Sequence, residues 1–279
     1  MLRLSCNSMK LNTFFILMLL LFVAQPISGQ SFRAMYEGEE VNLYDGEVTR
    51  DLFILQISRE GLSSFQSYFT LQRDSIRDAC VQQGISAQET VARMRSMPPG
   101  TKCRLYYNPR ENKYTEMDYG LYYFKSTEFA SKLDVVFEDS TKVVLGFHSE
   151  MAKAHYYGRD WVIFYTTEIS LPYGPWKING LPGVVTEAYS TDGAYRFQLK
   201  GFEVSEKDID ITIPTMMLNQ AVIEVSSKEL AWIRKQAACM DLRPIIKKYS
   251  KNFDMSGMYH DKIDQRYREL SKRYQYIEQ

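Results

Sequence analysis

Side chains that usually carry acid–base or metal chemistry are sparse in this chain. Only three histidines occur, His148, His155 and His260, and none has the spacing of a metal site or of a nucleophile motif. His148 and His155 are seven residues apart on predicted strand positions, and an odd separation places them on opposite faces of a sheet. The sequence also lacks a Gly-x-Ser-x-Gly motif, a phosphate loop and a nucleotide fingerprint. We therefore predict no catalytic residues, no metal and no cofactor.

Two pairs of carboxylates deserve comparison with a glycoside hydrolase. They are Glu187 with Asp192 and Asp160 with Glu168. Glycosidase chemistry requires a fixed separation between the two carboxyl groups, and nothing in the sequence sets one here. We interpret both pairs as solvated surface residues. A hydrolase with an atypical site is the third hypothesis.

The most distinctive segment is a corner rich in proline and glycine. Residues 172–183 read Pro-Tyr-Gly-Pro-Trp-Lys-Ile-Asn-Gly-Leu-Pro-Gly, in which six of twelve residues are glycine or proline. Proline fixes φ, and glycine allows the positive φ that a Pro-Gly turn requires. The sequence Leu181-Pro182-Gly183-Val184 therefore predicts a tight turn that leads into the next strand.

Aromatic residues gather close to this corner. Tyr and Trp offer rigid amphipathic surface to a protein, peptide or sugar, but they are also favoured in strands, where they build cores. Trp176 differs because it lies in a loop, where it is either a plug under the corner or an anchor for a partner. The predicted partner-binding or structural corner comprises Arg159, Trp161, Tyr165, Trp176, Leu181, Pro182 and Gly183.

The N-terminus has the features of a secretory signal. Arg3 and Lys10 precede an apolar run over residues 14–23, and Ser28-Gly29-Gln30 provides a small-residue exit. The apolar run is short for a membrane span, and no later stretch is long enough, although an uncleaved anchor is the alternative. We therefore expect a signal peptide over residues 1–29 and a mature protein without a transmembrane segment. Its predicted location is the periplasm or the outer membrane, or outside the cell.

The net charge of the mature chain limits the class of partner that it can bind. Cleavage would remove two of the 34 Lys and Arg residues and none of the 34 Asp and Glu residues, which leaves a nearly neutral chain. A nucleic acid is therefore disfavoured as partner.

Three cysteines remain, Cys80, Cys103 and Cys239, so at most one disulfide can form. We prefer Cys80 with Cys103, which border the same predicted insertion, and buried free thiols are the alternative.

Strand patterns dominate the first two hundred residues. An insertion of two short helices is predicted near residues 72–97, where Ser86 and Glu89 form a capping signal and Pro98-Pro99-Gly100 ends the helices. A turn is predicted at residues 138–141 and a hairpin at Thr191-Asp192-Gly193. The predicted strands are 32–36, 51–58, 103–107, 113–117, 134–137, 142–154, 161–167, 184–189 and 194–204.

The short connections between these strands predict an antiparallel meander, because parallel neighbours need longer crossovers. Tyr195, Phe197 and Leu199 alternate with polar residues, so one face of their strand is apolar. Residues 161–165 are apolar on both faces, which is typical of a central strand covered on both sides, and we expect helices to cover it.

Helical spacing replaces strand patterns after residue 226. Leu230, Ile233 and Ala237 are three or four residues apart, as are the apolar residues of 261–279, including Tyr274 and Ile277. The predicted fold class is α+β, mainly antiparallel β: a curved meander sheet with flanking helices and a helical C-terminal tail. The predicted organisation is a signal peptide at 1–29, a sheet domain at 30–210 and a helical region at 211–279.

The corner and its surroundings resemble a known family. Residues 180–185 read Gly-Leu-Pro-Gly-Val-Val, and they follow Gly158-Arg159-Asp160-Trp161, Thr166-Thr167-Glu168-Ile169 and Gly174-Pro175. In these motifs, residues 50–205 resemble the GLPGLI family of secreted proteins of Bacteroidetes-type bacteria. A cysteine frequent in that family is replaced here by Ser149. The resemblance implies a secreted cell-envelope protein of unassigned activity, linked with TonB-dependent outer-membrane receptors, and it brings no catalytic residues.

We therefore predict a secreted cell-envelope binding or accessory protein without catalytic activity. It would present the corner to a protein or peptide partner, and a TonB-dependent receptor is one such partner. The alternative is a periplasmic half-barrel that carries an acyl chain or another hydrophobic ligand, because apolar faces of a curved sheet can line an open groove.

Overall fold

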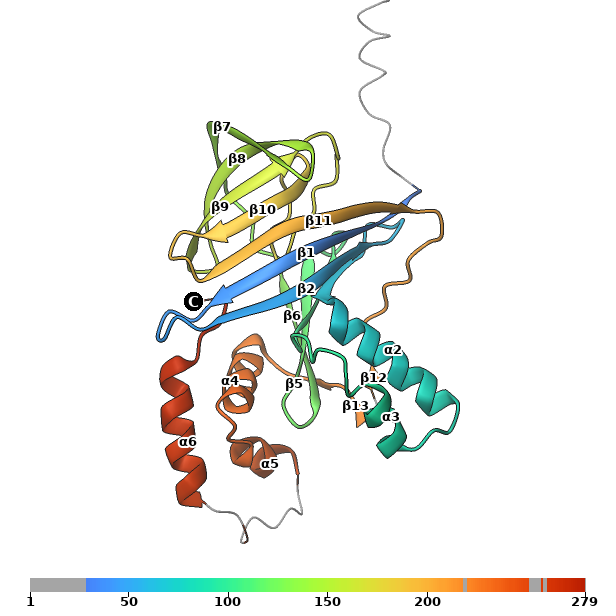
Figure 1. The fold of residues 1–279 in the computed structure, drawn as a ribbon, viewed down its shortest axis with the longest axis vertical. Coiled ribbons are helices and arrows are strands. Elements are labelled where there is room, and N and C mark those ends of the chain that lie inside the picture. Colours follow the sequence, from blue (N-terminus) through green and yellow to red (C-terminus); the bar gives the residue numbers. More distant parts are fainter. Residues whose placement is uncertain (1–28, 218–219, 251–256, 258–259, 279) are drawn as a thin grey trace, which may run out of the picture.

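Two antiparallel meanders lie side by side and form one sheet of twelve strands (Figure 1). The computed structural model describes residues 29–217, 220–250, 257 and 260–278, so the predicted signal peptide lies outside the described residues except for Gly29. The first meander comprises β1 (Ser31–Val41), β2 (Val48–Ile57), β3 (Ser63–Ser67), β4 (Arg104–Asn108), β5 (Lys113–Tyr119) and β6 (Tyr123–Phe129). The second comprises β7 (Val136–Val144), β8 (Phe147–Tyr156), β9 (Arg159–Thr166), β10 (Val184–Ser190) and β11 (Tyr195–Ser205).

The strand order is β14-β6-β5-β4-β3-β2-β1-β11-β10-β9-β8-β7, so strands follow the chain within each meander. The two meanders join where β1 pairs antiparallel with β11. β14 (Ile223–Glu224) pairs parallel with β6 at one edge. β12 (Met216–Met217) and β13 (Gln220–Ala221) form a separate small hairpin. The predicted α+β class with a mainly antiparallel sheet is confirmed.

The sheet curves so that both meanders face one core. Leu105 on β4 and Tyr114 on β5 belong to the same buried cluster as Trp161 on β9 and Phe197 on β11. Tyr36, on the central strand β1, is fully buried, and its hydroxyl donates to the carbonyl of Val185 at 2.7 Å. Strands from opposite halves can share a core in this way only if the sheet bends around it.

Helices flank the first meander, and three of them begin at a serine cap, of which Ser86 was predicted from the sequence. The side chains of Ser67, Ser86 and Ser226 accept hydrogen bonds from backbone N–H groups in the first turns of three helices. Helix α4 packs on β5 and β6 and builds a second, smaller core around Phe124. The helices are α2 (Tyr68–Gln82), α3 (Ala87–Arg93), α4 (Ser227–Ala238), α5 (Arg243–Tyr249) and α6 (His260–Arg273).

The predicted turn at residues 138–141 is wrong. β7 runs through this stretch as one strand with a bulge between Glu138 and Thr141, which absorbs the polar residues without reversing the chain. The reversal occurs at Leu145 and Gly146, whose φ angles are 51° and 86°. The hairpin between β10 and β11 does form where the Asp-Gly sequence predicted it, with Tyr189 opposite Arg196.

Three other expectations fail for identifiable reasons. The strand at residues 161–165 is covered by the corner, where Trp176 packs on Trp161, and helices α2 and α4 contact the first meander instead. Cys80, Cys103 and Cys239 are free thiols, so the preferred disulfide is absent from the described residues. The last predicted helix ends at Arg273, and the chain then becomes extended.

Candidate functional site

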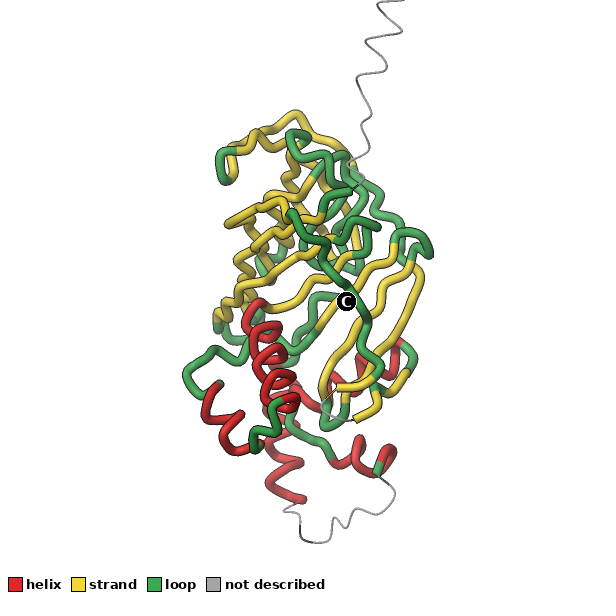
Figure 2. The backbone as a smooth tube through the Cα atoms, turned by 90° about the vertical axis from the view of Figure 1, so that its right-hand side faces the viewer, coloured by secondary structure: helices red, strands yellow, loops and turns green. Residues whose placement is uncertain are grey.

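The extended segment Tyr274–Glu278 lies on the concave side of the sheet. We call it the return segment, because α6 leads the chain back towards the sheet, ending beside the loop between β1 and β2, and this segment then continues onto the sheet (Figures 1 and 2). Ile277 is buried in the main core, together with side chains from both meanders. The return segment is therefore an element of the concave face, although it belongs to neither meander.

Arg159 at the start of β9 binds the main chain of the return segment. Its Nε donates to the carbonyl of Ile277, and its Nη2 donates to the carbonyl of Tyr276, both at 2.9 Å. Nη1 forms an ion pair with Asp192, and the guanidinium lies 4.9 Å from the centre of the Tyr195 ring. The guanidinium is buried and planar, so it fixes two consecutive carbonyls in a defined direction.

The loop between β1 and β2 holds the other end of the return segment. The amide of Asn42 donates to the carbonyl of Arg273 at 2.8 Å. Gln275 donates to the carbonyl of Val41 at 3.1 Å and accepts from the backbone N–H of Leu43 at 3.1 Å. Side chains thus supply the polar contacts that a paired strand would obtain from backbone groups.

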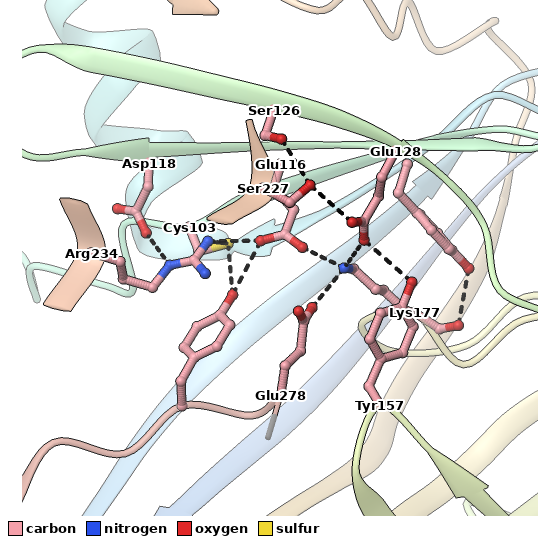
Figure 3. Close-up of polar contacts among 12 residues, drawn as sticks. Cys103, Glu116, Asp118, Ser126, Glu128, Tyr157, Lys177, Ser227, Arg234 and Glu278 are labelled. Carbon is pink, nitrogen blue, oxygen red and sulfur yellow. Dashed lines mark hydrogen bonds and ion pairs between the residues drawn. The ribbon is translucent and has the colours of Figure 1, made fainter. Parts of the chain in front are cut away.

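Lys177 lies at the centre of a buried cluster of charges (Figure 3). Its side chain is fully buried, and its Nζ lies 2.5 Å from Glu116, 2.7 Å from Glu128 and 2.6 Å from Glu278. The ammonium also lies 4.3 Å from the centre of the Tyr157 ring. These partners come from β5, β6, the turn before β9 and the return segment, so one cation joins four separate parts of the chain.

Arg234 on α4 extends this cluster (Figure 3). Its Nε donates to Asp118 at 2.8 Å, and its Nη2 donates to Glu116 at 2.7 Å. The guanidinium stacks 3.9 Å from the centre of the Tyr276 ring, and the Tyr276 hydroxyl donates to Glu116 at 3.2 Å. Burial raises the pKa of the neighbouring Cys103 thiol to about 12, so it is a neutral neighbour of these charges.

Four carboxylates share the two cations of this cluster, and the pKa values of two of them, Glu116 and Glu278, shift in opposite directions. Burial alone would raise the pKa of Glu116, but the charges of Lys177 and Arg234 lower it to about 2. Burial, followed by the repulsion of Glu116, raises the pKa of Glu278 to about 7. Glu278 is therefore protonated more easily than Glu116, and it belongs to the return segment.

Three cavities adjoin the return segment, and two of them reach the carboxylates of β5 and β6 or the main core. The smaller of these two has a volume of about 130 Å³, and we call it the groove. The larger has a volume of about 500 Å³ and is lined by carboxylates of the cluster together with Trp232 and Arg234 of α4. The return segment contributes to both, through Tyr276 in each, Ile277 in the groove and Glu278 in the larger cavity. The apolar lining of the groove comprises Phe53, Phe65, Leu105, Trp176, Tyr195 and Phe197.

The structure turns most of the predicted corner residues inward. The side chains of Trp161, Trp176 and Leu181 are buried, and only Pro182 of the predicted set is exposed. Gly183 is required sterically, because a Cβ at this position would overlap the carbonyl oxygen of Thr166. The corner therefore packs as a solid layer over β9.

Trp176 has two unusual features. Its φ is 53°, a left-handed conformation that is uncommon outside glycine. Its ring packs on Tyr156, Tyr157 and Trp161, but its Nε1–H is the one buried side-chain polar group without a hydrogen-bond partner among the described residues. Buried polar groups are normally paired in folded proteins, and this residue is also part of the lining of the groove.

The remaining predicted residues divide into two groups. Arg159, Trp161 and Trp176 meet close to the return segment. Tyr165 lies further along β9, where its ring contacts Phe137 and its hydroxyl donates to Glu150 at 2.9 Å.

The carboxylate pairs that resembled a glycosidase do not converge. Asp192 is paired with Arg159, and Asp160 lies 2.8 Å from His155. Glu187 is buried and not solvated as expected, and it is paired with Arg196 and Lys142. Glu168 accepts from the backbone N–H of His148 at 2.8 Å.

Sequence reasoning missed the charge cluster and the return segment. Lys177 is the only charged residue between positions 171 and 183, and a charge placed among Trp, Ile, Pro and Gly residues is the signal that could have revealed a buried cation. The segment at 274–278 gave no such signal, because Tyr274 and Ile277 also fit helical spacing.

Comparisons with known proteins supply no family. No family model and no curated protein matches the chain. Among solved structures, PNGF-II in its C2 and P21 crystal forms is similar with TM-scores of 0.49 and 0.48 and 11% sequence identity. Each match covers 75% of this chain and 34% of PNGF-II, so this chain spans about one third of that protein's length.

Among the described residues, no group of three or more His, Cys, Asp and Glu side chains is placed to hold a metal ion. In the same part of the chain, every helix is too short or too polar to cross a membrane.

Proposed function

We propose that this chain is an exported, non-catalytic binding protein whose groove takes an extended peptide from a partner in the cell envelope. The observation that supports it most strongly is the seating of the return segment. An apolar side chain is buried, two consecutive carbonyls are bound by Arg159, and an acidic side chain is bound by Lys177. Such a combination of pocket, main-chain contact and charge is typical of peptide recognition.

The groove replaces the corner as the proposed binding surface, because the corner's aromatic side chains are buried in the core. Its lining joins residues of both meanders, including Phe53 and Leu105 from the first and Tyr195 and Phe197 from the second. Ligand sites are generally concave and apolar with a few fixed polar groups. Arg159 and Lys177 do not line the groove itself, but they bind the segment that occupies it and would act as such groups at its border. The setting in the envelope and the link with TonB-dependent receptors rest on the family resemblance and stay predictions.

Photo-crosslinking with defined peptides tests this proposal. The full chain is mixed with a pool of biotinylated hexapeptides that carry a photoreactive leucine, and the labelled residues are mapped by mass spectrometry. We expect labelling at Phe53, Phe65 and Phe197, and no labelling with a matched pool in which glycine and serine replace the apolar positions. Labelling scattered over exposed residues such as Tyr44 would contradict a peptide site in the groove.

A carrier of acyl chains is the second candidate, and the apolar lining of the groove favours it. A photoreactive fatty acid in the same experiment distinguishes the two functions. If the fatty acid labels the groove and the peptides do not, the carrier replaces the peptide-binding protein.

A hydrolase would have to use the carboxylates in the larger cavity. Glu116, Glu128 and Glu278 do line it, and two of them differ widely in pKa. All three, however, are bound to the ammonium of Lys177. We therefore favour a structural and ligand-positioning role for this cluster over a catalytic one.

A further inference from the structure

The return segment is attached to the sheet differently from the strands around it. Among the described residues, no backbone-to-backbone hydrogen bond involves positions 274–278, and no strand pairing includes them. Their contacts run through side chains of Arg159, Lys177 and Gln275 and through the buried Ile277. The segment can therefore leave without breaking the sheet.

The helix that carries the return segment is also held weakly. Among its described residues, α6 buries none. Its polar contacts include a hydrogen bond from Gln236 of α4 to the Tyr267 hydroxyl at 3.4 Å. Arg273 at its end pairs with Asp45 and Glu47, and Arg243 of α5 pairs with Asp264. Exposed ion pairs of this kind contribute roughly 0–1 kcal/mol each. The cost of moving α6 is therefore small, and the return segment itself provides most of the attachment.

The groove is too small for a ligand while the segment is seated. Its volume of about 130 Å³ is below the roughly 300 Å³ at which small-molecule pockets begin. Ile277 and Tyr276 line it together with Trp176, whose Nε1–H is buried without a hydrogen-bond partner. Departure of these two side chains would enlarge the groove, and a peptide carbonyl could then accept from Trp176.

We propose that the return segment is an internal occupant of the binding groove, and that the external ligand which displaces it is an extended peptide with an aliphatic residue followed by an acidic one. This inference rests on the proposed peptide-binding function and adds ligand chemistry and autoinhibition to it. The aliphatic residue takes the place of Ile277, and the acidic residue takes the place of Glu278 at Lys177. Arg159 then binds the carbonyl of the aliphatic residue and that of the residue before it, as it now binds the carbonyls of Ile277 and Tyr276.

An occupant on the same chain competes at a high effective concentration. For flexible tethers this concentration is on the order of millimolar, so an external peptide with similar contacts binds weakly until the internal copy is weakened. The apparent dissociation constant is the intrinsic value divided by the fraction of open groove. Weakening the return segment must therefore strengthen external binding, which is the opposite of what damage to the site would do.

The test uses the full chain and a fluorescein-labelled peptide, Tyr-Gln-Tyr-Ile-Glu, with the sequence of residues 274–278. Fluorescence anisotropy gives its dissociation constant. We expect Ile277→Ser to bind the probe at least about tenfold more tightly than the unaltered chain. The matched control is Ile263→Ser on α6, a half-buried isoleucine outside the groove, which should bind as the unaltered chain does. A second probe with serine in place of isoleucine should bind Ile277→Ser at least about tenfold more weakly than the first.

Equal affinity of Ile277→Ser and the unaltered chain for the probe would overturn the inference, provided that circular dichroism shows a folded variant. If the variant does not fold, amide hydrogen exchange in the unaltered chain provides a second test. A saturating probe should accelerate amide exchange at 274–278, and unchanged exchange at saturation would also overturn the inference. If peptides of the defined pool label the groove but exchange at 274–278 does not change, the proposed function stands and the internal occupant does not.

Discussion

At the scale of single residues, Lys177 is the cation on which the buried charge cluster depends. Three carboxylates contact its ammonium, and its side chain is fully buried. Removal of one partner of a buried ion pair costs roughly 3–5 kcal/mol, because the remaining charge is left uncompensated. We expect Lys177→Met to lower the free energy of unfolding by about that amount in guanidinium titrations.

Lys153→Met is the matched control for Lys177→Met. Lys153 forms an exposed pair with Glu138 at 3.0 Å, so its loss should change the free energy of unfolding by less than about 0.5 kcal/mol. Equal effects of the two substitutions would show that the cluster is not the buried ionic centre described here.

The raised pKa of Glu278 predicts a stability that depends on pH. The carboxylate faces Lys177 from the corner, Glu116 from β5, Glu128 from β6 and Tyr157 from the turn before β9. The folded chain holds the proton up to about pH 7, whereas the unfolded chain releases it near the ordinary pKa of 4.5. The folded state thus binds more protons between these values, and its stability falls as the pH rises from 4.5 to 7.

Comparison with Glu278→Gln isolates this contribution. We expect the unfolding free energy of the unaltered chain to fall relative to that of the variant by on the order of 2 kcal/mol between pH 4.5 and 7. Denaturant titrations of both proteins at several pH values measure it. A constant difference across this range would contradict the raised pKa.

At the scale of elements, the corner depends on glycine where β10 begins. A Cβ at Gly183 would overlap the carbonyl oxygen of Thr166 on the neighbouring strand, and backbone cannot move aside easily. We expect Gly183→Ala to cost about 2–4 kcal/mol in denaturant titrations. Gly201→Ala on β11 is the control, because its nearest neighbour, Met35, would lie 3.9 Å from the new Cβ, and it should change stability by less than about 1 kcal/mol. A mild effect at Gly183 would show that the corner is not rigid.

Elements whose ends are fixed by neighbouring residues, such as a helix cap or a tight turn, could be predicted from the sequence. The cap at Ser86 marked the start of α3, and the Asp-Gly turn marked the hairpin of β10 and β11. β3 escaped prediction because its sequence, Ser-Ser-Phe-Gln-Ser, is polar although every residue is buried. The path of residues 274–278 escaped because it is decided by distant partners, Arg159 and Lys177, which helical spacing does not encode. Long-range ionic contacts are the part of this site that periodicity cannot show.

At the scale of the whole molecule, the pairing of β1 with β11 makes two meanders one body. The main core contains side chains from both, including Tyr114 from the first and Phe197 from the second. Neither meander can keep its apolar face buried alone, so the sheet should unfold as a single unit. α6 buries no residue and should open at a lower free energy than the sheet.

Cooperative unfolding can be tested with the tryptophans of the chain. Trp161 and Trp176 report on the main core. Trp232 belongs to α4 and packs against the second core. In Trp232→Phe, the guanidinium midpoint from tryptophan fluorescence should coincide with the midpoint from far-ultraviolet circular dichroism. Phe197→Ala in the shared core should shift both midpoints together and cost about 3–5 kcal/mol, whereas Phe129→Ala, at a side chain that is 72% exposed, should cost less than about 0.5 kcal/mol. Two separated transitions would mean that each meander folds independently, and the groove between them could then open by movement of the meanders without release of the return segment.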